Sequence, residues 1–339
     1  MKTHPLVAGL TLALASTLCL TGCSTSAHED DAQSSSTATT AQPSAYPATV
    51  MSCTEKLTFT EAPKRVLILG DTNAPTLSML DLLDRVTMRT GKIDTTGYDV
   101  NTATKLMSLP EMKSGTTTLG GGASVATESI LDAHIDLVIG YDEGLDRAAL
   151  RKAGVKVYAP DTFCPHGTGT DHASFDLVTK EVSKVGDIFG VPDKARTLND
   201  ELTGQVKDLT SQASKDSQHS AAALWVEPGN SGFYTYGTSS MVQPILEANG
   251  LRNVYDGERK RVFDATMEDV LNRDPEWIVL LAQEGDIAKT KPAFLKYKGA
   301  SQLQAVRKNQ VVVIPFSLTD PPTPQSIKGA VELNKLLKK

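Results

Sequence analysis

The chain has 339 residues and a formal net charge of −6, and it shows no stripe of basic residues with interleaved aromatic side chains. This composition argues against nucleic acid as a partner, because nucleic-acid interfaces concentrate lysine and arginine on one face. Beyond the N-terminal region roughly 290 residues remain, enough for two domains of ordinary size. No apolar run in the sequence is long enough to cross a membrane as a helix.

The N-terminus has the features of a secretory signal. After a weakly basic start, residues 6–20 form an apolar run without a charge, which suits the core of a signal peptide. The run ends in Leu-Thr-Gly-Cys23, which resembles a bacterial lipobox, in which the cysteine thiol takes a lipid and the chain is cleaved before it. We therefore predict a signal peptide over residues 1–22 and a lipid such as palmitate on Cys23. The alternative is an ordinary signal peptide with an accidental cysteine.

Residues 23–49 are rich in Ser, Thr, Ala, Asp and Gln and almost free of large apolar side chains. Such a stretch cannot bury enough surface to fold, so we predict a flexible tether. Lipid, tether and folded body then follow in the order of a protein anchored at the extracellular face of the cell membrane.

From residue 50 onward, short apolar runs alternate with segments of helical periodicity. Continuous apolar runs indicate strands that are covered on both faces. These runs occupy residues 65–69, 136–141, 155–158, 221–226, 277–281 and 311–314. Apolar residues at helical spacing, with start and stop signals at their ends, indicate helices. They occupy residues 75–83, 127–133, 146–153, 174–189, 193–213, 241–248 and 267–273. This order predicts a three-layer α/β fold in two halves around a helical segment.

One short unit occurs twice. Residues 128–139 align without gaps on residues 268–279: an acidic residue opens a helix in each, and another acidic residue precedes a buried strand. One α/β unit per half is therefore predicted. The carboxylates of Glu128 and Glu268 also have a purely structural explanation, because acidic residues in a first turn favour the helix dipole.

The whole body resembles a known family. The similar stretches are residues 61–67, 128–141, 150–160, 185–191, 237–253, 267–281 and 311–315. In these stretches and their order, the chain resembles the iron-siderophore, haem and cobalamin branch of the ABC-transporter solute-binding lipoproteins. The resemblance implies two rigid α/β lobes joined by one long helix, with the ligand in the cleft between them. We accordingly expect one lobe at residues 50–173, the connecting helix at 174–190 and the second lobe at 191–339.

The resemblance also implies partners. A glutamate on each lobe of these proteins pairs with arginines of the permease dimer, and the matching positions here are Glu128 and Glu268. We expect a monomer that docks onto an ABC permease, with no catalytic activity and no resident cofactor.

Two cysteines remain after export. Cys19 lies in the predicted signal peptide and Cys23 is predicted to be lipidated, so Cys53 and Cys164 form an even pair in an oxidising compartment. We predict a disulfide between them, as cysteines near these positions are familiar in related actinobacterial proteins. Two free buried thiols are the alternative.

The ligand site is expected beyond the carboxyl ends of the strands, where open α/β sheets bind ligands. Those ends carry residues 71–73, 141–143, 161–163, 225–227, 283–284 and 316–317. A ferric siderophore is a bulky chelate, often negatively charged, whose oxygens already hold the iron. Its receptor therefore needs aromatic walls and a few cationic donors rather than metal ligands. The predicted ligand-binding residues are Trp225, Tyr236, Tyr234, Arg259, Arg261, Arg89, Tyr141 and Asn73.

Other interpretations stay open. The arginines could instead be solvated charges on the surface. Trp225 and Tyr236 could instead lie in the hydrophobic core rather than in the cleft. Haem is the nearest rival ligand and requires an axial Tyr or His, which Tyr234 or Tyr236 could supply. His134 reads as a surface residue.

Metal and enzyme functions are not predicted. The loop with His166 and His172 is too flexible for a preformed metal site. The sequence contains no nucleophile elbow, phosphate loop, dinucleotide fingerprint or His-Glu-x-x-His motif, and therefore no enzyme signature. A sensor or adhesin on the same fold is a further alternative. The presence of both glutamates, at positions 128 and 268, argues against it.

Overall fold

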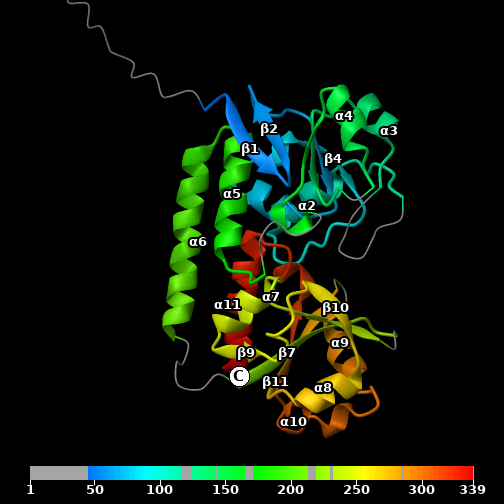
Figure 1. Cartoon of the computed structure of the whole chain (residues 1–339), viewed down its shortest axis with the longest axis vertical. Helices are drawn as coiled ribbons and strands as arrows, with labels where there is room; N and C mark the ends of the chain where they lie inside the picture. Colours follow the sequence, from blue (N-terminus) through cyan, green and yellow to red (C-terminus); the bar gives the residue numbers. More distant parts are fainter. Residues whose placement is uncertain are drawn as a thin grey trace, which may run out of the picture. The chain divides into compact units, whose positions relative to one another are not determined.

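The computed structural model describes residues 45–115, 124–142, 144–164, 171–212, 219–229, 232–283 and 286–338. These residues form two α/β lobes (Figure 1), which confirms the predicted fold class. The predicted signal peptide, Cys23 and nearly all of the predicted tether lie outside the described residues. Among the helices that are described, none combines the length and apolarity needed to span a bilayer.

An antiparallel hairpin opens the described chain. It consists of β1 (Ala48–Ser52) and β2 (Glu55–Phe59). Before it, the Tyr46 hydroxyl donates a hydrogen bond of 2.9 Å to the carbonyl oxygen of Ile188. The folded body therefore starts a few residues before the predicted boundary at residue 50, because this short segment pairs and packs against the first lobe.

The first lobe contains a parallel sheet in the order β4-β3-β5-β6. Its strands are β3 (Val66–Leu69), β4 (Val86–Thr90), β5 (Leu137–Gly140) and β6 (Lys156–Tyr158). Its helices before the connection are α1 (Ala74–Met79), α2 (Val100–Ser108), α3 (Thr127–Asp132) and α4 (Arg147–Lys152). Val66 and Ile68 pack into one core cluster, whereas Leu67 and Leu69 pack into another on the opposite face. Successive side chains of a strand point to opposite faces, and both faces of β3 are covered, so β3 is apolar at every position.

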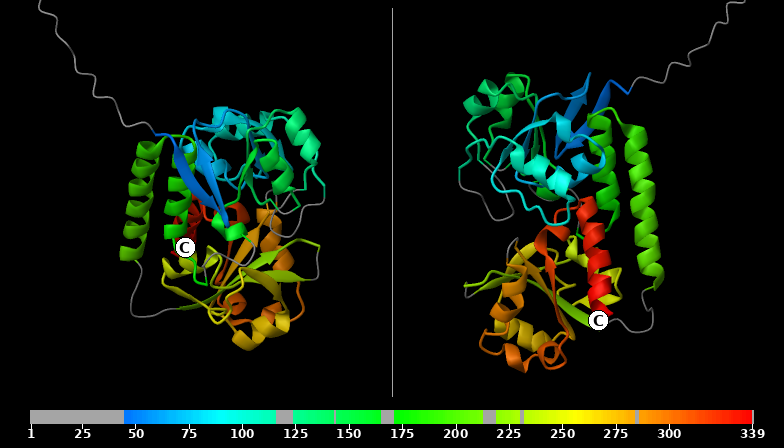
Figure 2. Two further views of the ribbon diagram at one scale, coloured as in Figure 1. Left: turned by 45° about the horizontal axis from the view of Figure 1, so that its top comes forward. Right: turned by 180° about the vertical axis from the view of Figure 1, so that it is seen from behind.

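The second lobe has a mixed sheet in the order β10-β8-β7-β11-β12, with β9 also paired to β7. Its strands are β7 (His219–Val226), β8 (Phe233–Tyr236), β9 (Leu251–Asn253), β10 (Val262–Ala265), β11 (Trp277–Ala282) and β12 (Val311–Pro315). Its helices are α7 (Val242–Glu247), α8 (Met267–Arg273), α9 (Ile287–Phe294), α10 (Gln304–Arg307) and α11 (Pro324–Leu337). Apolar clusters again cover both faces of the sheet. Figure 2 shows helices on both sides of it, so this lobe also has three layers.

The connection between the lobes differs from the prediction. The helix predicted at 174–190 is α5 (Asp176–Ile188), whose buried valines belong to the core of the first lobe. The next helix, α6 (Pro192–Gln212), contributes Leu198 to that core and Leu209 to the core of the second lobe. The long crossing helix is therefore α6, which runs beside both lobes in Figure 1. The sequence periodicity predicts the apolar face of α5, but it does not indicate which core that face packs into.

The predicted repeat is present as two helix–strand units, α3 with β5 and α8 with β11. At the aligned positions after each helix, His134 and Asp274 both adopt positive φ angles of 52° and 36°. The same left-handed turn thus leads each helix into a buried strand. His134 is exposed, as the sequence indicated.

A disulfide joins Cys53, in the turn of the hairpin, to Cys164, with Cα atoms 5.2 Å apart. It spans a sequence separation of 111 residues. In the chain-entropy model, a loop of this length stabilises the folded state by about 2–5 kcal/mol. The bond ties the hairpin to the short 3₁₀ turn Asp161–Phe163, which reaches the cavity described next.

Candidate ligand-binding site

A cavity of about 610 Å³ is lined by residues of both lobes. Its wall is built at the carboxyl ends of β3, β4, β7, β11 and β12, with the ends of β8 and β10 and the Asp161–Phe163 turn. This is the edge at which open α/β sheets bind ligands. The lining residues that carry the argument below are Asp71, Lys92, Asp94, Tyr98, Phe163, Trp225, Glu227, Tyr234, Tyr236, Arg261, Asp320, Thr323 and Gln325.

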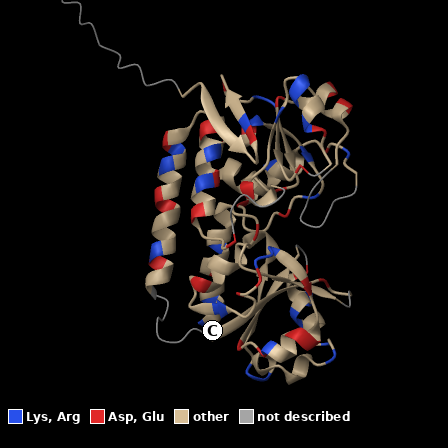
Figure 3. Cartoon of the chain, in the orientation of Figure 1, with Lys and Arg blue, Asp and Glu red and all other residues tan. Residues whose placement is uncertain are grey.

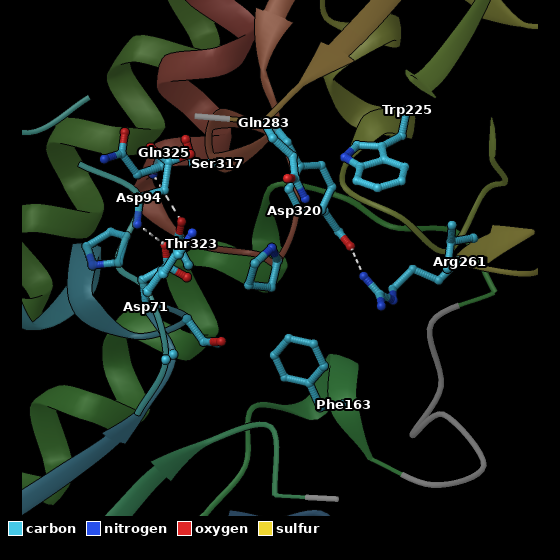
Figure 4. Close-up of a pocket in the computed structure, with 18 of the residues that line it drawn as sticks. Asp71, Asp94, Phe163, Trp225, Arg261, Gln283, Ser317, Asp320, Thr323 and Gln325 are labelled. Carbon is cyan, nitrogen blue, oxygen red and sulfur yellow. Dashed lines mark hydrogen bonds and ion pairs between the residues drawn. The ribbon is translucent and has the colours of Figure 1, made fainter. Parts of the chain in front are cut away.

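Aromatic side chains form one side of the cavity. Trp225, at the end of β7, lies beside Tyr234 with ring centroids 5.6 Å apart. Phe163 comes from the first lobe, and the Arg261 guanidinium of the second lobe lies 5.7 Å from its ring centroid. Figure 4 shows Phe163, Trp225 and Arg261 around an open space. The arrangement offers apolar and cation–π surface to a bulky ligand.

The charge of Arg261 is compensated within the protein. Its guanidinium forms an ion pair with Asp320, whose side chain is only 1% exposed. Asp320 also accepts a hydrogen bond of 3.0 Å from the backbone N–H of Met241. Although burial acts to lower the pKa of Arg261, the neighbouring Asp320 carboxylate raises it, so the guanidinium stays charged. Arg261 therefore places a positive charge at the cavity wall, and its ion pair with Asp320 fixes its position.

The opposite side of the cavity is acidic. Asp71 follows β3 and Asp94 follows β4, and the backbone N–H of Asp94 donates a 3.0 Å hydrogen bond to the Asp71 carboxylate. Asp94 in turn accepts a 2.8 Å hydrogen bond from the backbone N–H of Thr96. Burial and the nearby Asp71 carboxylate raise the pKa of the Tyr98 phenol, which therefore remains neutral.

Residues at the start of α11 reach this acidic side from the second lobe. The Thr323 hydroxyl accepts a 3.2 Å hydrogen bond from the backbone N–H of Gln325 and caps the helix. Gln325 packs against Gly97, where a Cβ would lie 2.6 Å from the Gln325 amide oxygen. Gly97 has a φ of +90°, which glycine adopts readily. The contact holds the segment after β4 against α11.

The structure places four of the eight predicted ligand residues in the cavity wall. Trp225, Tyr234 and Arg261 line it with partly exposed side chains. Tyr236 also lines it but is only 4% exposed and belongs to the core of the second lobe. Burial and the Asp320 carboxylate raise the pKa of Tyr236, so its hydroxyl keeps its proton.

The other four are not among the lining residues. Arg89 is buried, donates to the Gly91 carbonyl oxygen and lies 3.3 Å from the Glu111 carboxylate. Arg259 is 77% exposed at its side chain and pairs with Asp171 at 2.9 Å. Asn73 is buried at the start of α1.

Tyr141 stacks on Phe163 with ring centroids 4.9 Å apart and thus supports a wall residue. Arg89, Arg259 and Tyr141 are directed by local partners that the sequence pattern does not reveal.

Sequence reasoning missed several wall residues, chiefly Lys92, Asp94, Tyr98, Asp320, Thr323 and Gln325. Residues 91–98 follow β4, a strand that the sequence did not reveal because polar residues interrupt it. Residues 319–325 follow the predicted strand at 311–314 after the short 3₁₀ turn Phe316–Leu318, and they contain three prolines. Because this segment follows a parallel strand, its position could have indicated that it reaches the ligand-binding edge of the sheet.

The two glutamates of the repeat lie on the surface. Glu128 and Glu268 are both exposed in the first turns of α3 and α8. Within the described residues, neither forms an ion pair. Figure 3 marks acidic residues in red along the ribbons of both helices. Elsewhere, His172 lies 3.1 Å from Glu247, and His166 is outside the described residues.

Comparison with known proteins gives a consistent result. A family model described as periplasmic binding protein matches residues 66–318. The crystal structure of an ABC-type Fe³⁺-hydroxamate transport system from Saccharomonospora viridis is 33% identical, with a TM-score of 0.78. That match covers 87% of this chain and all of the other chain.

Two more distant matches concern haem proteins. The periplasmic heme binding protein HutB of Vibrio cholerae shares the fold at 16% identity and a TM-score of 0.64, over 82% of this chain and 100% of its own. The high-affinity heme uptake system protein IsdE of Staphylococcus aureus is 25% identical over 157 residues. This match covers 44% of the chain and 53% of IsdE, so the chain spans about half the length of the curated relatives it matches.

Proposed function

Because the chain belongs to the periplasmic binding protein family, a family of solute-binding proteins and not of enzymes, we propose that it captures a ferric siderophore and delivers it to an ABC permease. The observation that carries the proposal is the aromatic wall of Trp225, Tyr234 and Phe163 at the carboxyl ends of the strands. The 33% identity to a chain from a Fe³⁺-hydroxamate transport system favours a hydroxamate chelate.

The cavity has the properties that such a ligand requires. Ligand pockets usually enclose about 300–1,000 Å³ and combine apolar surface with a few placed polar groups, and the volume here is about 610 Å³. The iron of a siderophore is already bound by the oxygens of the chelator, so the receptor recognises the outer surface of the chelate. Aromatic rings supply contact area at a low cost in conformational entropy.

Haem is the second candidate, because Tyr234 lies in the wall with a partly exposed ring and IsdE is a heme uptake protein. An axial tyrosine binds ferric haem as tyrosinate. Tyr236 is poorly suited to this role, since burial raises the pKa of its phenol. Tyr234 is therefore the residue through which haem binding would be detected.

Titration with ferric trihydroxamates should quench the fluorescence of Trp225. We expect sub-micromolar dissociation constants and strong quenching, because the chelate absorbs light and would lie against the indole. Trp277 provides a matched control, since it pairs with Ala221 at the opposite end of the sheet. Quenching should disappear in Trp225→Phe and persist in Trp277→Phe, with calorimetry reporting affinity in both. Tight haem binding with a tyrosinate band that is lost in Tyr234→Phe, and no hydroxamate binding, would replace the siderophore with haem.

We further propose that a lipid on Cys23 anchors the protein at the extracellular face of the membrane. One acyl chain binds a membrane only marginally, whereas two or more anchor stably. Cys23→Ala should therefore release the protein into the medium or block its processing, as fractionation and mass spectrometry will show. Cys19→Ala, in the same predicted signal peptide, is the control and should leave anchoring intact. Normal processing and membrane retention of Cys23→Ala would exclude the lipid anchor.

A further inference from the structure

The ionisable side chains of the cavity have an excess of negative charge. The lining contains four carboxylates and two basic side chains, namely Asp71, Asp94, Glu227, Asp320, Lys92 and Arg261. The formal sum is therefore two negative charges. A receptor for an anionic chelate is expected to show the opposite balance, because like charges in a partly desolvated site repel.

The two basic side chains do little to neutralise the negative charge that a bound ligand would meet. Arg261 is already paired with Asp320, a carboxylate that is 1% exposed and also bonded to the Met241 N–H. Lys92 is exposed, so water and salt screen the charge of its ammonium group. The carboxylates of Asp71, Asp94 and Glu227 therefore outnumber the basic side chains of the lining that are not paired with Asp320.

The acceptors are concentrated on one side. Figure 4 shows Asp71, Asp94, Thr323 and Gln325 together on the side opposite Trp225, Phe163 and Arg261. Gln325 is 6% exposed, and its amide oxygen has no hydrogen-bond partner among the described residues. Because this oxygen packs against Gly97, a donor on the ligand would reach it only after the amide rotates, and would then recover the cost of an unpaired buried acceptor. The Asp71 carboxylate accepts the hydrogen bond from the Asp94 N–H and lines the cavity beside Asp94.

These observations favour one class of chelate. Three hydroxamates balance the charge of Fe³⁺, so the core of a trihydroxamate complex is neutral, whereas three catecholates leave a large negative charge. Building on the proposed function, we propose that the site selects ferric hydroxamates with a protonated amine arm. The arm lies toward Asp71, Asp94 and Gln325, and the neutral core lies against the aromatic wall. An ammonium group has three donors and no acceptor, which matches a cluster of acceptors.

Three chelates with the same core test this proposal: ferric desferrioxamine B, with a free terminal amine, its neutral N-acetyl derivative, and its anionic N-succinyl derivative. By calorimetry at low salt, we expect the amine form to bind about tenfold more tightly than the acetyl form. The succinyl form should bind most weakly. Asp71→Asn combined with Asp94→Asn should remove the preference for the amine. In this variant the amine form should bind no more tightly than the acetyl form, and circular dichroism with thermal unfolding shows separately that the variant is folded.

The control variant is Asp208→Asn, an exposed acidic residue of α6 far along the chain from the lining residues. It should leave all three affinities unchanged. Equal binding of the three chelates, or tightest binding of the succinyl form, would overturn the charge selection and leave the siderophore function standing. Failure of all three to bind would instead overturn the proposed function. An undiminished amine preference in the double variant would show that Asp71 and Asp94 do not hold the arm.

Discussion

Charge reversal at both Glu128 and Glu268 is expected to abolish uptake of the ferric chelate in cells while leaving the affinity of the isolated protein unchanged. Both carboxylates are exposed, one in the first turn of α3 and one in that of α8, and neither lines the cavity. Uptake of radioactive iron by cells and calorimetry on the purified variants measure the two quantities.

The physical reason is complementarity of charge. If the glutamates dock onto arginines of a permease, each contact is a charge-assisted pair, and Glu→Lys converts attraction into repulsion. The equivalent helix–strand units of the two lobes would then carry one contact each, so each single variant should retain part of the uptake.

The control for this experiment changes the same number of charges elsewhere. Glu201→Lys with Asp208→Lys reverses two exposed acidic residues on α6, and uptake should persist. Loss of ligand affinity in the Glu128/Glu268 variant would show instead that these residues support the site. Undiminished uptake would remove the docking role.

The Asp320→Ala substitution is expected to lower the free energy of unfolding by about 3–5 kcal/mol, because it leaves the mostly buried Arg261 guanidinium, whose side chain is 21% exposed, without its counter-ion. Asp320 is 1% exposed, pairs with Arg261 and accepts the Met241 N–H. Combining Asp320→Ala with Arg261→Met should cost less than the two single changes together, with an interaction of about 1–3 kcal/mol. Denaturant unfolding of the four proteins without ligand measures the cycle.

The exposed pair of Arg259 and Asp171 is the matched control for this cycle. Its partners are 77% and 75% exposed at the side chain, so Asp171→Ala should cost less than about 1 kcal/mol. Equal losses for Asp171→Ala and Asp320→Ala would contradict the assignment of a stabilising buried pair. Additive single effects at Arg261 and Asp320 would do the same.

Much of the fold was predictable because burial leaves a pattern in the sequence. The strands β3, β5, β7, β11 and β12 are covered on both faces and therefore read as continuous apolar runs. Strands such as β4 and β10 have polar residues in their short spans and were missed. The α5 helix was located by its apolar period, whereas its place in the first lobe was not.

The candidate site was only partly predictable for a different reason. Residues that end buried strands, such as Trp225, could be placed at the edge of the sheet in advance. Asp94 lies in a loop without periodicity, and α11, the helix that carries Gln325, was not predicted from the sequence. The two segments meet where Gly97 packs against the start of α11. Arg89 and Arg259 are the same residue type as Arg261 but are drawn away from the cavity by Glu111 and Asp171.

The sequence by itself therefore determined the fold class, the family and the repeated unit, because these depend on burial and on local motifs spread along the chain. Only the tertiary structure decided the charge of the cavity and the partner of each arginine. Those properties depend on which side chains distant in sequence come within hydrogen-bonding distance. The ion pair of Arg261 with Asp320, separated by 59 positions, is the clearest case, since it converts a candidate ligand cation into a compensated charge.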